Sequence, residues 1–198
     1  MWLLGAASNG VSNIGYSSDG IRWNYASTSV NTLFGKVSGL ASNGAMWVAG
    51  GNSPLFNAGC LAYSYNGIDW INAASGTNIF TSFAAGVTWN GVMWLAGGLG
   101  TSSIACSYDG INWTGISNPL SGCNNLAYNG AMWVAVGTNF TYAGGNSIAY
   151  SYDGINWTLS TSGSSIVLNG SNIVWNGAIW VVVGAFNSGG SGDLAAYS

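Results

Sequence analysis

Short apolar and aromatic runs recur along the chain, and most lie beside an Asn-Gly or Asp-Gly pair. Runs such as Met132 to Val136 are apolar at almost every position, which predicts β-strands that are covered on both faces. Asp-Gly and Asn-Gly pairs accept the positive φ angles of a tight hairpin turn. The runs after Asp-Gly are rich in β-branched and aromatic residues, as strands prefer. The pattern therefore predicts an all-β chain of antiparallel hairpins.

One turn motif, Ser-x-Asp-Gly-x-x-Trp, is complete four times, and a fifth copy begins at Ala196-Tyr197-Ser198. We expect the Ser and Asp side chains to hydrogen-bond backbone groups of the turn, and the Trp to pack at the sheet edge, so that the motif is structural. The residues assigned this role are Ser17, Asp19, Gly20, Trp23, Ser64, Asn66, Gly67, Trp70, Ser107, Asp109, Gly110, Trp113, Ser151, Asp153, Gly154 and Trp157.

A second motif, Asn-Gly followed by an apolar strand with Trp, alternates with the first. Its tryptophans are spaced by 45, 47, 39 and 47 residues, and those of the first motif by 47, 43 and 44 (Trp2, Trp47, Trp94, Trp133 and Trp180; Trp23, Trp70, Trp113 and Trp157). Two independent markers thus give a period of about 45 residues, which is typical of β-propeller repeats.

Each period contains two hairpins and hence four strands, which is one propeller blade. We predict a β-propeller of about five four-stranded blades in a single domain, with repeats at about 1–36, 37–82, 83–122, 123–170 and 171–198. The first blade lacks its first strand and the last lacks its fourth. We expect either a section of a longer repeat array or a chain completed by another copy, because open ends of repeat stacks need capping. Tryptophans are expected to fill the layers between blades.

The Ser-x-Asp-Gly-x-x-Trp turns resemble the Asp-box, or BNR, repeat of sialidase-like β-propellers. In that family the box lies at the turn between the third and fourth strands of a blade, which agrees with the placement here. The usual box has one more residue between Asp and Gly, and the second copy has Asn66 in place of Asp. The resemblance implies a propeller fold along the whole chain.

The catalytic residues of family sialidases are missing from this sequence. Such enzymes use an arginine triad, a Tyr nucleophile with a Glu partner, and an Asp acid. Here Arg22 is the single arginine and there is no Glu. The carboxylates Asp19, Asp69, Asp109, Asp153 and Asp193 are spread over the repeats, whereas glycoside hydrolysis needs a paired acid and base. The sequence predicts a protein that is not an enzyme and that has no cofactor or metal site; a glycoside hydrolase is the least favoured alternative.

The small number of charged residues restricts the kinds of partner that the protein is expected to bind. Only 4% of residues are charged and the net charge is −3, against roughly 25% charged residues in ordinary domains. Two cations are too few for nucleic acid binding, and no apolar run reaches the ~18 residues of a membrane span. So few charges give little protection against association. The three cysteines have neither a metal spacing nor an even count, although one bridge between two of them stays open.

Two classes of function remain. The first is a structural or recognition module that associates with itself or other subunits, outside the cell, on a cell surface or on a virion. The second is a lectin-like module that binds neutral glycans. The strand connections opposite the Asp-Gly and Asn-Gly turns are long and variable, as binding loops often are, and aromatics with amide neighbours suit sugars and proteins. The candidate ligand-binding residues are Tyr65, Tyr108, Tyr152, Phe56, Phe140 and Tyr142.

Overall fold

The computed structural model describes residues 1–7, 12–27, 33–52, 59–73, 79–116, 119–138, 147–186 and 195–197. Its strands form five consecutive antiparallel units. Unit one contains β1 (Trp2–Gly5), β2 (Ile14–Ser17) and β3 (Asn24–Tyr25). Unit two contains β4 (Lys36–Ser42), β5 (Trp47–Asn52), β6 (Leu61–Ser64) and β7 (Ile71–Asn72). Unit three contains β8 (Phe83–Trp89), β9 (Trp94–Leu99), β10 (Ile104–Ser107) and β11 (Thr114–Gly115).

Units four and five continue the same pattern. Unit four contains β12 (Gly122–Tyr128), β13 (Trp133–Thr138), β14 (Ile148–Ser151) and β15 (Thr158–Leu159). Unit five contains β16 (Val167–Trp175), β17 (Trp180–Phe186) and β18 (Ala195–Tyr197). A short helix, α2 (Thr161–Ile166), links the two units. The sequence did not predict this helix, which begins at the capping residue Ser160.

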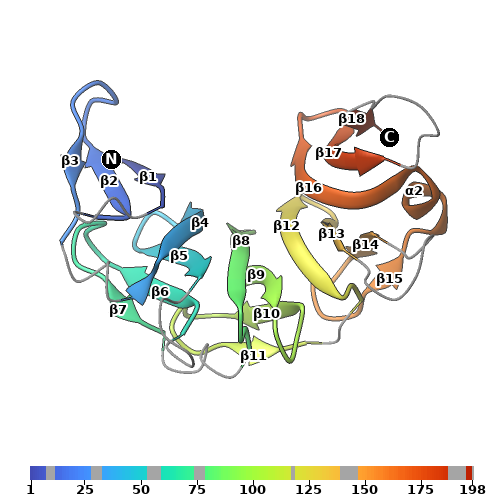
Figure 1. Ribbon diagram of the computed structural model, residues 1–198, viewed down its shortest axis with the longest axis horizontal. Coiled ribbons are helices and arrows are strands. Elements are labelled where there is room, and N and C mark those ends of the chain that lie inside the picture. Colours follow the sequence, from blue (N-terminus) through green and yellow to red (C-terminus); the bar gives the residue numbers. More distant parts are fainter. Residues whose placement is uncertain are drawn as a thin grey trace.

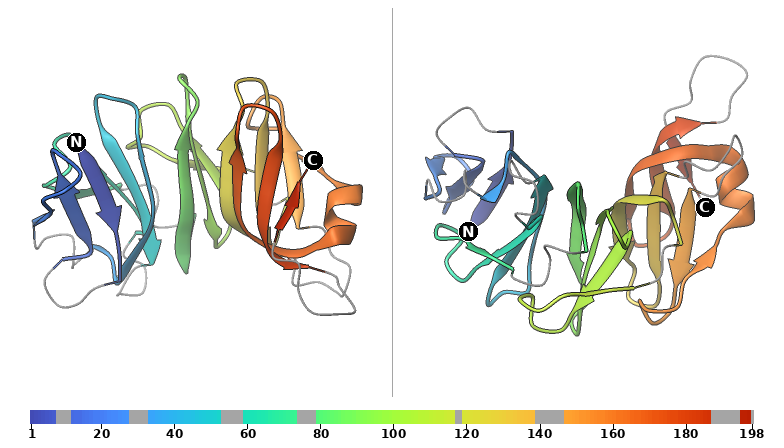
Figure 2. Two further views of the ribbon diagram at one scale, coloured as in Figure 1. Left: turned by 90° about the horizontal axis from the view of Figure 1, so that it is seen from above. Right: turned by 60° about the horizontal axis from the view of Figure 1, so that its bottom comes forward.

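The five units are arranged side by side along an open arc (Figure 1). The long first strands β4, β8, β12 and β16 line the inner side of the arc, and the two-residue strands β7, β11 and β15 lie at its outer side. Neighbouring inner strands also contact one another. Seen from above, the long strands stand upright next to each other, along the axis of the arc (Figure 2). The prediction of an all-β, propeller-like fold is confirmed.

In both kinds of hairpin turn, one side-chain oxygen accepts hydrogen bonds from two backbone N–H groups. In the Asn-Gly turn, Asn43 Oδ1 accepts hydrogen bonds from the backbone N–H groups of Ala45 and Met46, at 3.0 and 2.9 Å. In the Asp-Gly turn, Asp19 Oδ1 accepts from Ile21 and Arg22, both at 2.8 Å. These N–H groups are engaged by the turn, so the following strand begins later than the sequence suggested. The motif tryptophans therefore precede the fourth strand instead of lying in it.

In the part of the chain that the structure describes, the buried apolar residues form four clusters, one at each boundary between units. At the boundary of units two and three, Val48 and Met46 pack with Trp94 and Ala96. Successive positions of the second strand of each unit therefore face opposite neighbours, which explains why these strands are apolar throughout. The burial of Trp94 and Trp133, 0% and 1% exposed, agrees with tryptophan layers between units.

The tryptophans of the first unit are exposed, unlike those that lie in layers between units. Trp2 is 62% exposed and Trp23 is 46% exposed, because no earlier unit lies against them in the structure. Trp2 and Trp23 thus lie outside the layers between the described units. Burial of a tryptophan depends on the neighbouring unit, which the local motif does not encode.

Candidate functional site

A polar cavity of about 560 Å³ lies on the inner side of the arc, between the inner strands. We call it the axial cavity. Its lining combines hydroxyl, amide, aromatic and ammonium side chains from units two to five (Lys36, Ser38, Asn52, Phe83, Ala85, Asn124, Asn125, Ser171 and Asn172). Lys36 begins β4, Asn52 ends β5 and Phe83 begins β8. The cavity therefore lies toward the face with the variable connections, opposite the Asp-Gly and Asn-Gly turns.

A β-bulge at the same place in each inner strand forms the lining. The register skips one residue between Val37 and Gly39, Ala84 and Gly86, Cys123 and Asn125, and Gly170 and Asn172. The skipped residues are Ser38, Ala85, Asn124 and Ser171, and all four line the axial cavity. A bulge bends the strand and redirects a side chain. Four aligned bulges thus place one side chain from each inner strand at the axis.

Close packing of the inner strands depends on glycines next to the bulges. A Cβ built on Gly39 would clash with the carbonyl oxygen of Ala85, and one on Gly86 would stand 2.8 Å from Asn125 Oδ1. Real Cβ atoms do not approach so closely, so a side chain at either position would push neighbouring units apart. These two glycines keep the cavity walls in contact.

Asparagine amides connect the fourth and fifth units across the axial cavity. Asn124 Nδ2 donates to Asn169 Oδ1 at 3.0 Å and to the Gly170 carbonyl at 2.9 Å. Asn125 Nδ2 donates to Asn172 Oδ1. The Oδ1 atoms of Asn125 and Asn172 each accept from the next backbone N–H, both at 2.7 Å. Hydrogen-bonded amides have fixed orientations, so this wall of the cavity is preorganised.

The charge of the axial cavity is positive but weak. Among the described residues that line it, Lys36 is the single cation and none is a carboxylate. Among the described residues, no group of three His, Cys, Asp or Glu side chains gathers to hold a metal. The geometry suits ligands that offer hydrogen-bond acceptors and donors with little charge.

The Ser-x-Asp-Gly-x-x-Trp turns form compact hydrogen-bonded caps. Ser107 Oγ accepts from the Gly110 N–H at 2.8 Å and donates to Asp109 Oδ1 at 3.0 Å. Asp109 Oδ1 also accepts from the N–H groups of Ile111 and Asn112, at 2.9 and 2.7 Å. Trp113 Nε1 donates to the Gly110 carbonyl at 3.1 Å. The side chains of the turn are thus engaged within the turn itself.

The second copy shows that an amide serves as well as a carboxylate. Asn66 Oδ1 accepts from the N–H groups of Ile68 and Asp69, at 2.9 and 2.8 Å. Ser64 Oγ accepts from Gly67 at 2.8 Å, as in the other copies. One acceptor oxygen is therefore what the turn requires.

Hydrogen bonds from the turn lower the pKa values of its carboxyl groups. The N–H groups of Arg22 and Ile21 lower the pKa of Asp19. Burial raises the pKa of Asp109, but the backbone and side-chain hydrogen bonds from Asn112 outweigh it, and the pKa falls to about 2. The backbone and side-chain N–H groups of Asn156 hold the pKa of Asp153 well below its ordinary value. These carboxylates are ionised at neutral pH.

The predicted ligand-binding tyrosines are exposed but do not converge. Tyr65, Tyr108 and Tyr152 are 65%, 68% and 73% exposed, one in each of units two to four. Tyr65 and Tyr152 stack edge-on against Tyr63 and Tyr150 of their own hairpins, with ring centroids 5.9 and 6.0 Å apart. None of the three lines the axial cavity. Phe56, Phe140, Tyr142 and Asp193 lie outside the described residues.

The three cysteines, Cys60, Cys106 and Cys123, are buried thiols, and Cys60 Sγ donates a hydrogen bond to the Phe80 carbonyl at 3.2 Å. No disulfide joins any two of them. The alternative of one bridge, which the sequence left open, is therefore wrong for this structure. Burial raises the pKa of Cys106, and it raises that of Cys123 to about 12. Such thiols are poor nucleophiles at neutral pH.

The sequence did not reveal the axial cavity. Its polar residues occupy inner strands whose sequences are typical of ordinary strands, and the only local signal is Gly or Asn at one register position (Gly39, Gly86, Asn125 and Asn172).

Among the described residues, no helix is long and apolar enough to cross a membrane.

No protein-family model and no curated protein matches the chain. Among solved structures it is similar to the computationally designed Ika8 protein, with 11% identity, a TM-score of 0.50, and coverage of 75% of this chain and 43% of that chain. It is also similar to a chain of the nidogen/laminin complex, with 13% identity, a TM-score of 0.56, and coverage of 76% and 57%. The chain thus matches about half the length of these structures. Fold and comparisons define a β-propeller-like repeat protein.

Proposed function

We propose that this chain is a non-catalytic recognition module, a β-propeller of about five blades with incomplete first and last blades, that binds a protein partner through the axial cavity. The observation that carries the proposal is the alignment of four bulges, which place Ser38, Ala85, Asn124 and Ser171 around one space. Binding residues commonly stand on irregular backbone over a rigid scaffold. The nidogen/laminin complex is a protein–protein assembly, which supports the proposal by analogy only.

The chemistry of the cavity favours a polar peptide segment. Backbone N–H and C=O groups of an extended peptide match the amides of Asn124, Asn125 and Asn172. Lys36 adds attraction for a carbonyl or carboxylate oxygen. Catalysis is not part of the proposal, since Asp19, Asp109 and Asp153 cap separate turns.

The proposal is tested by selecting binders from a random peptide display library on the purified chain. Binding is then measured for the variants Ser171→Trp, which narrows the cavity at an exposed position, and Tyr108→Ala on a distant turn. We expect Ser171→Trp to weaken binding roughly tenfold or more and Tyr108→Ala to leave it unchanged. Peptides that bind equally well to both variants contradict the axial site.

A neutral glycan is the second candidate, because Phe83 lines the cavity beside amides and hydroxyls. Aromatic faces with a few polar groups are typical of neutral ligand sites. A broad glycan array separates the candidates. Glycan binding lost in Ser171→Trp assigns the sugar to the cavity, whereas loss in Tyr108→Ala assigns it to the exposed turns.

We also propose that the protein works in an assembly, in an extracellular, cell-surface or virion-surface setting. Two observations support this. Only 4% of its residues are charged. Trp2 and Leu4 are 62% and 57% exposed, on the face of unit one that points away from unit two. An exposed apolar face on a weakly charged protein favours association.

A further inference from the structure

Asn-Gly pairs are chemically labile as well as turn-forming. The backbone nitrogen of the glycine can attack the side-chain amide carbon of the asparagine, because glycine has no side chain that blocks the approach. The chain contains seven such pairs, of which Asn9-Gly10 lies outside the described residues. The six described pairs begin at Asn43, Asn66, Asn90, Asn129, Asn169 and Asn176. The structure places them in very different surroundings.

Four of these pairs form the turns between the first and second strands of a unit, and they project into solvent. All four turn glycines are exposed. A Cβ built on any of them meets no atom within 4 Å (Gly44, Gly91, Gly130 and Gly177). Water and hydroxide therefore reach the glycine nitrogen, and a released ammonia molecule has an open path away.

The attacking nitrogen is unengaged in three of the four turns. Within the described part of the chain, no acceptor bonds to the N–H groups of Gly91, Gly130 and Gly177. The Gly44 N–H, in contrast, donates to Ser42 Oγ at 3.0 Å. The residue two positions before the glycine is aromatic in the other three turns (Trp89, Tyr128 and Trp175). Ring closure in these three turns breaks no hydrogen bond of the glycine.

The amide carbon under attack is polarised by the turn itself. Asn129 Oδ1 accepts hydrogen bonds from the backbone N–H groups of Ala131 and Met132, at 2.9 and 2.8 Å. Asn90 and Asn176 accept the same pair of bonds. Negative charge develops on Oδ1 when the glycine nitrogen adds to Cγ, and donors that are already in place stabilise it. The turn backbone thus favours the addition step.

The Asn66-Gly67 pair, in a Ser-x-Asn-Gly-x-x-Trp turn, is held at both reacting nitrogens. The buried Gly67 donates its N–H to Ser64 Oγ at 2.8 Å. Asn66 Nδ2, the leaving group, donates to Asp69 Oδ2 at 2.9 Å. Ring closure at Asn66 must therefore break two hydrogen bonds. The Asn169-Gly170 pair is also protected, since its glycine is buried in β16.

We propose that the turns at Asn90, Asn129 and Asn176 are sites of spontaneous deamidation, which converts each asparagine to aspartate in the folded chain. Hydroxide removes the glycine N–H proton, and the nitrogen bonds to Cγ. The Cγ–Nδ2 bond then breaks, and Nδ2 takes a proton from water and leaves as ammonia. Water opens the succinimide ring by breaking the Cγ–N bond, which gives aspartate, or the backbone C–N bond, which gives isoaspartate. No oxidation or reduction occurs.

Aspartate fits these turns, as the Asp-Gly turns of the same chain show. Asp109 Oδ1 accepts from the N–H groups two and three positions further on, as Asn129 Oδ1 does. Isoaspartate adds a methylene group to the backbone of the turn and displaces the capping oxygen, and it can close to the succinimide again. We therefore expect aspartate to accumulate in the folded chain.

Deamidation changes the charge of one face of the protein. Three conversions double the net charge of −3, and the new charges lie on the face opposite the axial cavity. Added aspartates oppose the association of a weakly charged protein. The three turns thus form a slow charge switch. This consequence rests on the proposed assembly, whereas the chemistry of the turns does not.

The rates are measured on the purified full chain, incubated at mildly alkaline pH. Samples are digested with pepsin in acid, which stops the reaction, and the Asn, Asp and isoaspartyl peptides are separated and identified by mass spectrometry. We expect the three turns to convert roughly tenfold faster than Asn66 or more, because Asn66 must break two hydrogen bonds. Asn43 should fall between them. No conversion, or conversion of Asn66 as fast as Asn129, overturns the proposal.

Two controls show whether the fold sets these rates. In denaturant the described pairs should convert at similar rates, and an unchanged ranking there would assign the rates to local sequence and overturn the proposal. Ser42→Ala frees the Gly44 N–H, and conversion of Asn43 should rise several-fold, with unchanged near-UV circular dichroism. An unchanged rate at Asn43 contradicts the protection on which the proposal depends.

The triple variant Asn90→Asp, Asn129→Asp and Asn176→Asp tests the product. Its melting temperature should stay close to that of the parent chain, and a large loss would contradict the accumulation of aspartate. Light scattering should give a lower mass for the variant than for the parent at equal concentration. Equal masses overturn the charge switch, while the measured rates decide the deamidation separately. None of these variants alters the axial cavity, so peptide binding there succeeds or fails independently.

Discussion

Met46 of unit two packs against Gly110 of unit three: a Cβ built on this glycine would stand 3.1 Å from both the sulfur and the Cε of Met46. Gly110 also has a φ of 74°, which L-residues rarely adopt. The same pair recurs as Met93 and Gly154. One glycine thus serves the turn of its own unit and the contact with the unit before it.

Substitution of Gly110 separates these two roles when a matched glycine is used as control. Gly130 has a φ of 97° but no neighbouring atom within 4 Å of a built Cβ. Gly130→Ala should destabilise by about 1–2 kcal/mol from backbone strain alone. Gly110→Ala should cost about 1 kcal/mol more, because the methyl group crowds Met46.

Urea unfolding midpoints of the two variants and the parent chain measure this difference. Equal losses in Gly110→Ala and Gly130→Ala would show that the contact with Met46 adds nothing to the strain of the turn. A double-mutant cycle with Met46→Ala isolates the contact: Gly110→Ala should cost less in the Met46→Ala background than in the parent chain, although Trp94 Nε1 still stands 3.2 Å from the built Cβ.

Stability should fall in acid because of the turn carboxylates. The pKa of Asp109 is about 2 in the folded chain, against an ordinary value of 3.8, and that of Asp153 is also lowered. A folded-state pKa below the unfolded one stabilises the fold above about pH 4. This contribution is lost as pH falls from about 4 toward 2, which thermal unfolding at a series of pH values should show.

The double variant Asp109→Asn and Asp153→Asn tests the origin of the acid sensitivity. Asn66 already caps the second turn with an amide oxygen, so the variant should fold normally at neutral pH. Its melting temperature should change less between pH 4 and 2 than that of the parent chain. An unchanged pH profile would assign the acid sensitivity to other groups.

The cysteines should be unreactive in the folded chain. All three are buried and none forms a disulfide, and burial raises the pKa of Cys123 to about 12. A thiol reagent at pH 8 should label them slowly in buffer and rapidly in denaturant, because the thiolate is the reactive form. Rapid labelling of one cysteine without denaturant would reveal local opening of its unit boundary.

The face of unit one that points away from unit two should promote self-association of the chain. Trp2 is 62% exposed, whereas Trp94 and Trp133 at the same repeat position are 0% and 1% exposed. Light scattering over a concentration series should show a rising mass, and Trp2→Ser combined with Leu4→Ser should reduce it. A monomer at all concentrations would refute the self-association proposed from the low charge.

Strands and turns were readable from the sequence because their signals are local. Asp109 and Gly110 specify a turn through atoms within three residues, and Ser107 completes the cap from the same stretch. The apolar second strands predicted cover on both faces, and units packed on both sides supply it. The delayed start of the fourth strands was not foreseen, since hydrogen bonds to the Asp side chain replace ladder pairing there.

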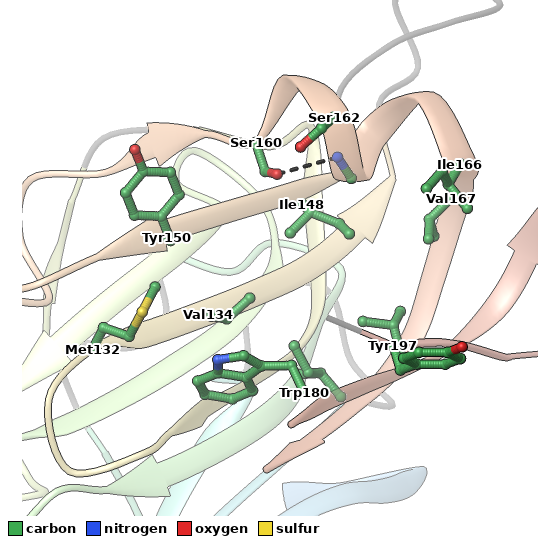
Figure 3. Close-up of a pocket in the computed structure, with 13 residues that line it drawn as sticks. Met132, Val134, Ile148, Tyr150, Ser160, Ser162, Ile166, Val167, Trp180 and Tyr197 are labelled. Carbon is green, nitrogen blue, oxygen red and sulfur yellow. Dashed lines mark hydrogen bonds between the residues drawn. The ribbon is translucent and has the colours of Figure 1, made fainter. Parts of the chain in front are cut away.

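The sequence by itself determined the strand order, the hairpin turns and the repeat period, because each rests on contacts between near neighbours in the chain. Only the tertiary structure decided the two cavities. The axial cavity needs four bulges in line and amides such as Asn125 and Asn172, which meet although they lie 47 residues apart. The second cavity, which lies between units four and five beside α2 (Figure 3), needs Met132 and Trp180 on facing sheets. Contacts of this range follow from how successive units pack, and no local pattern of residues encodes that packing.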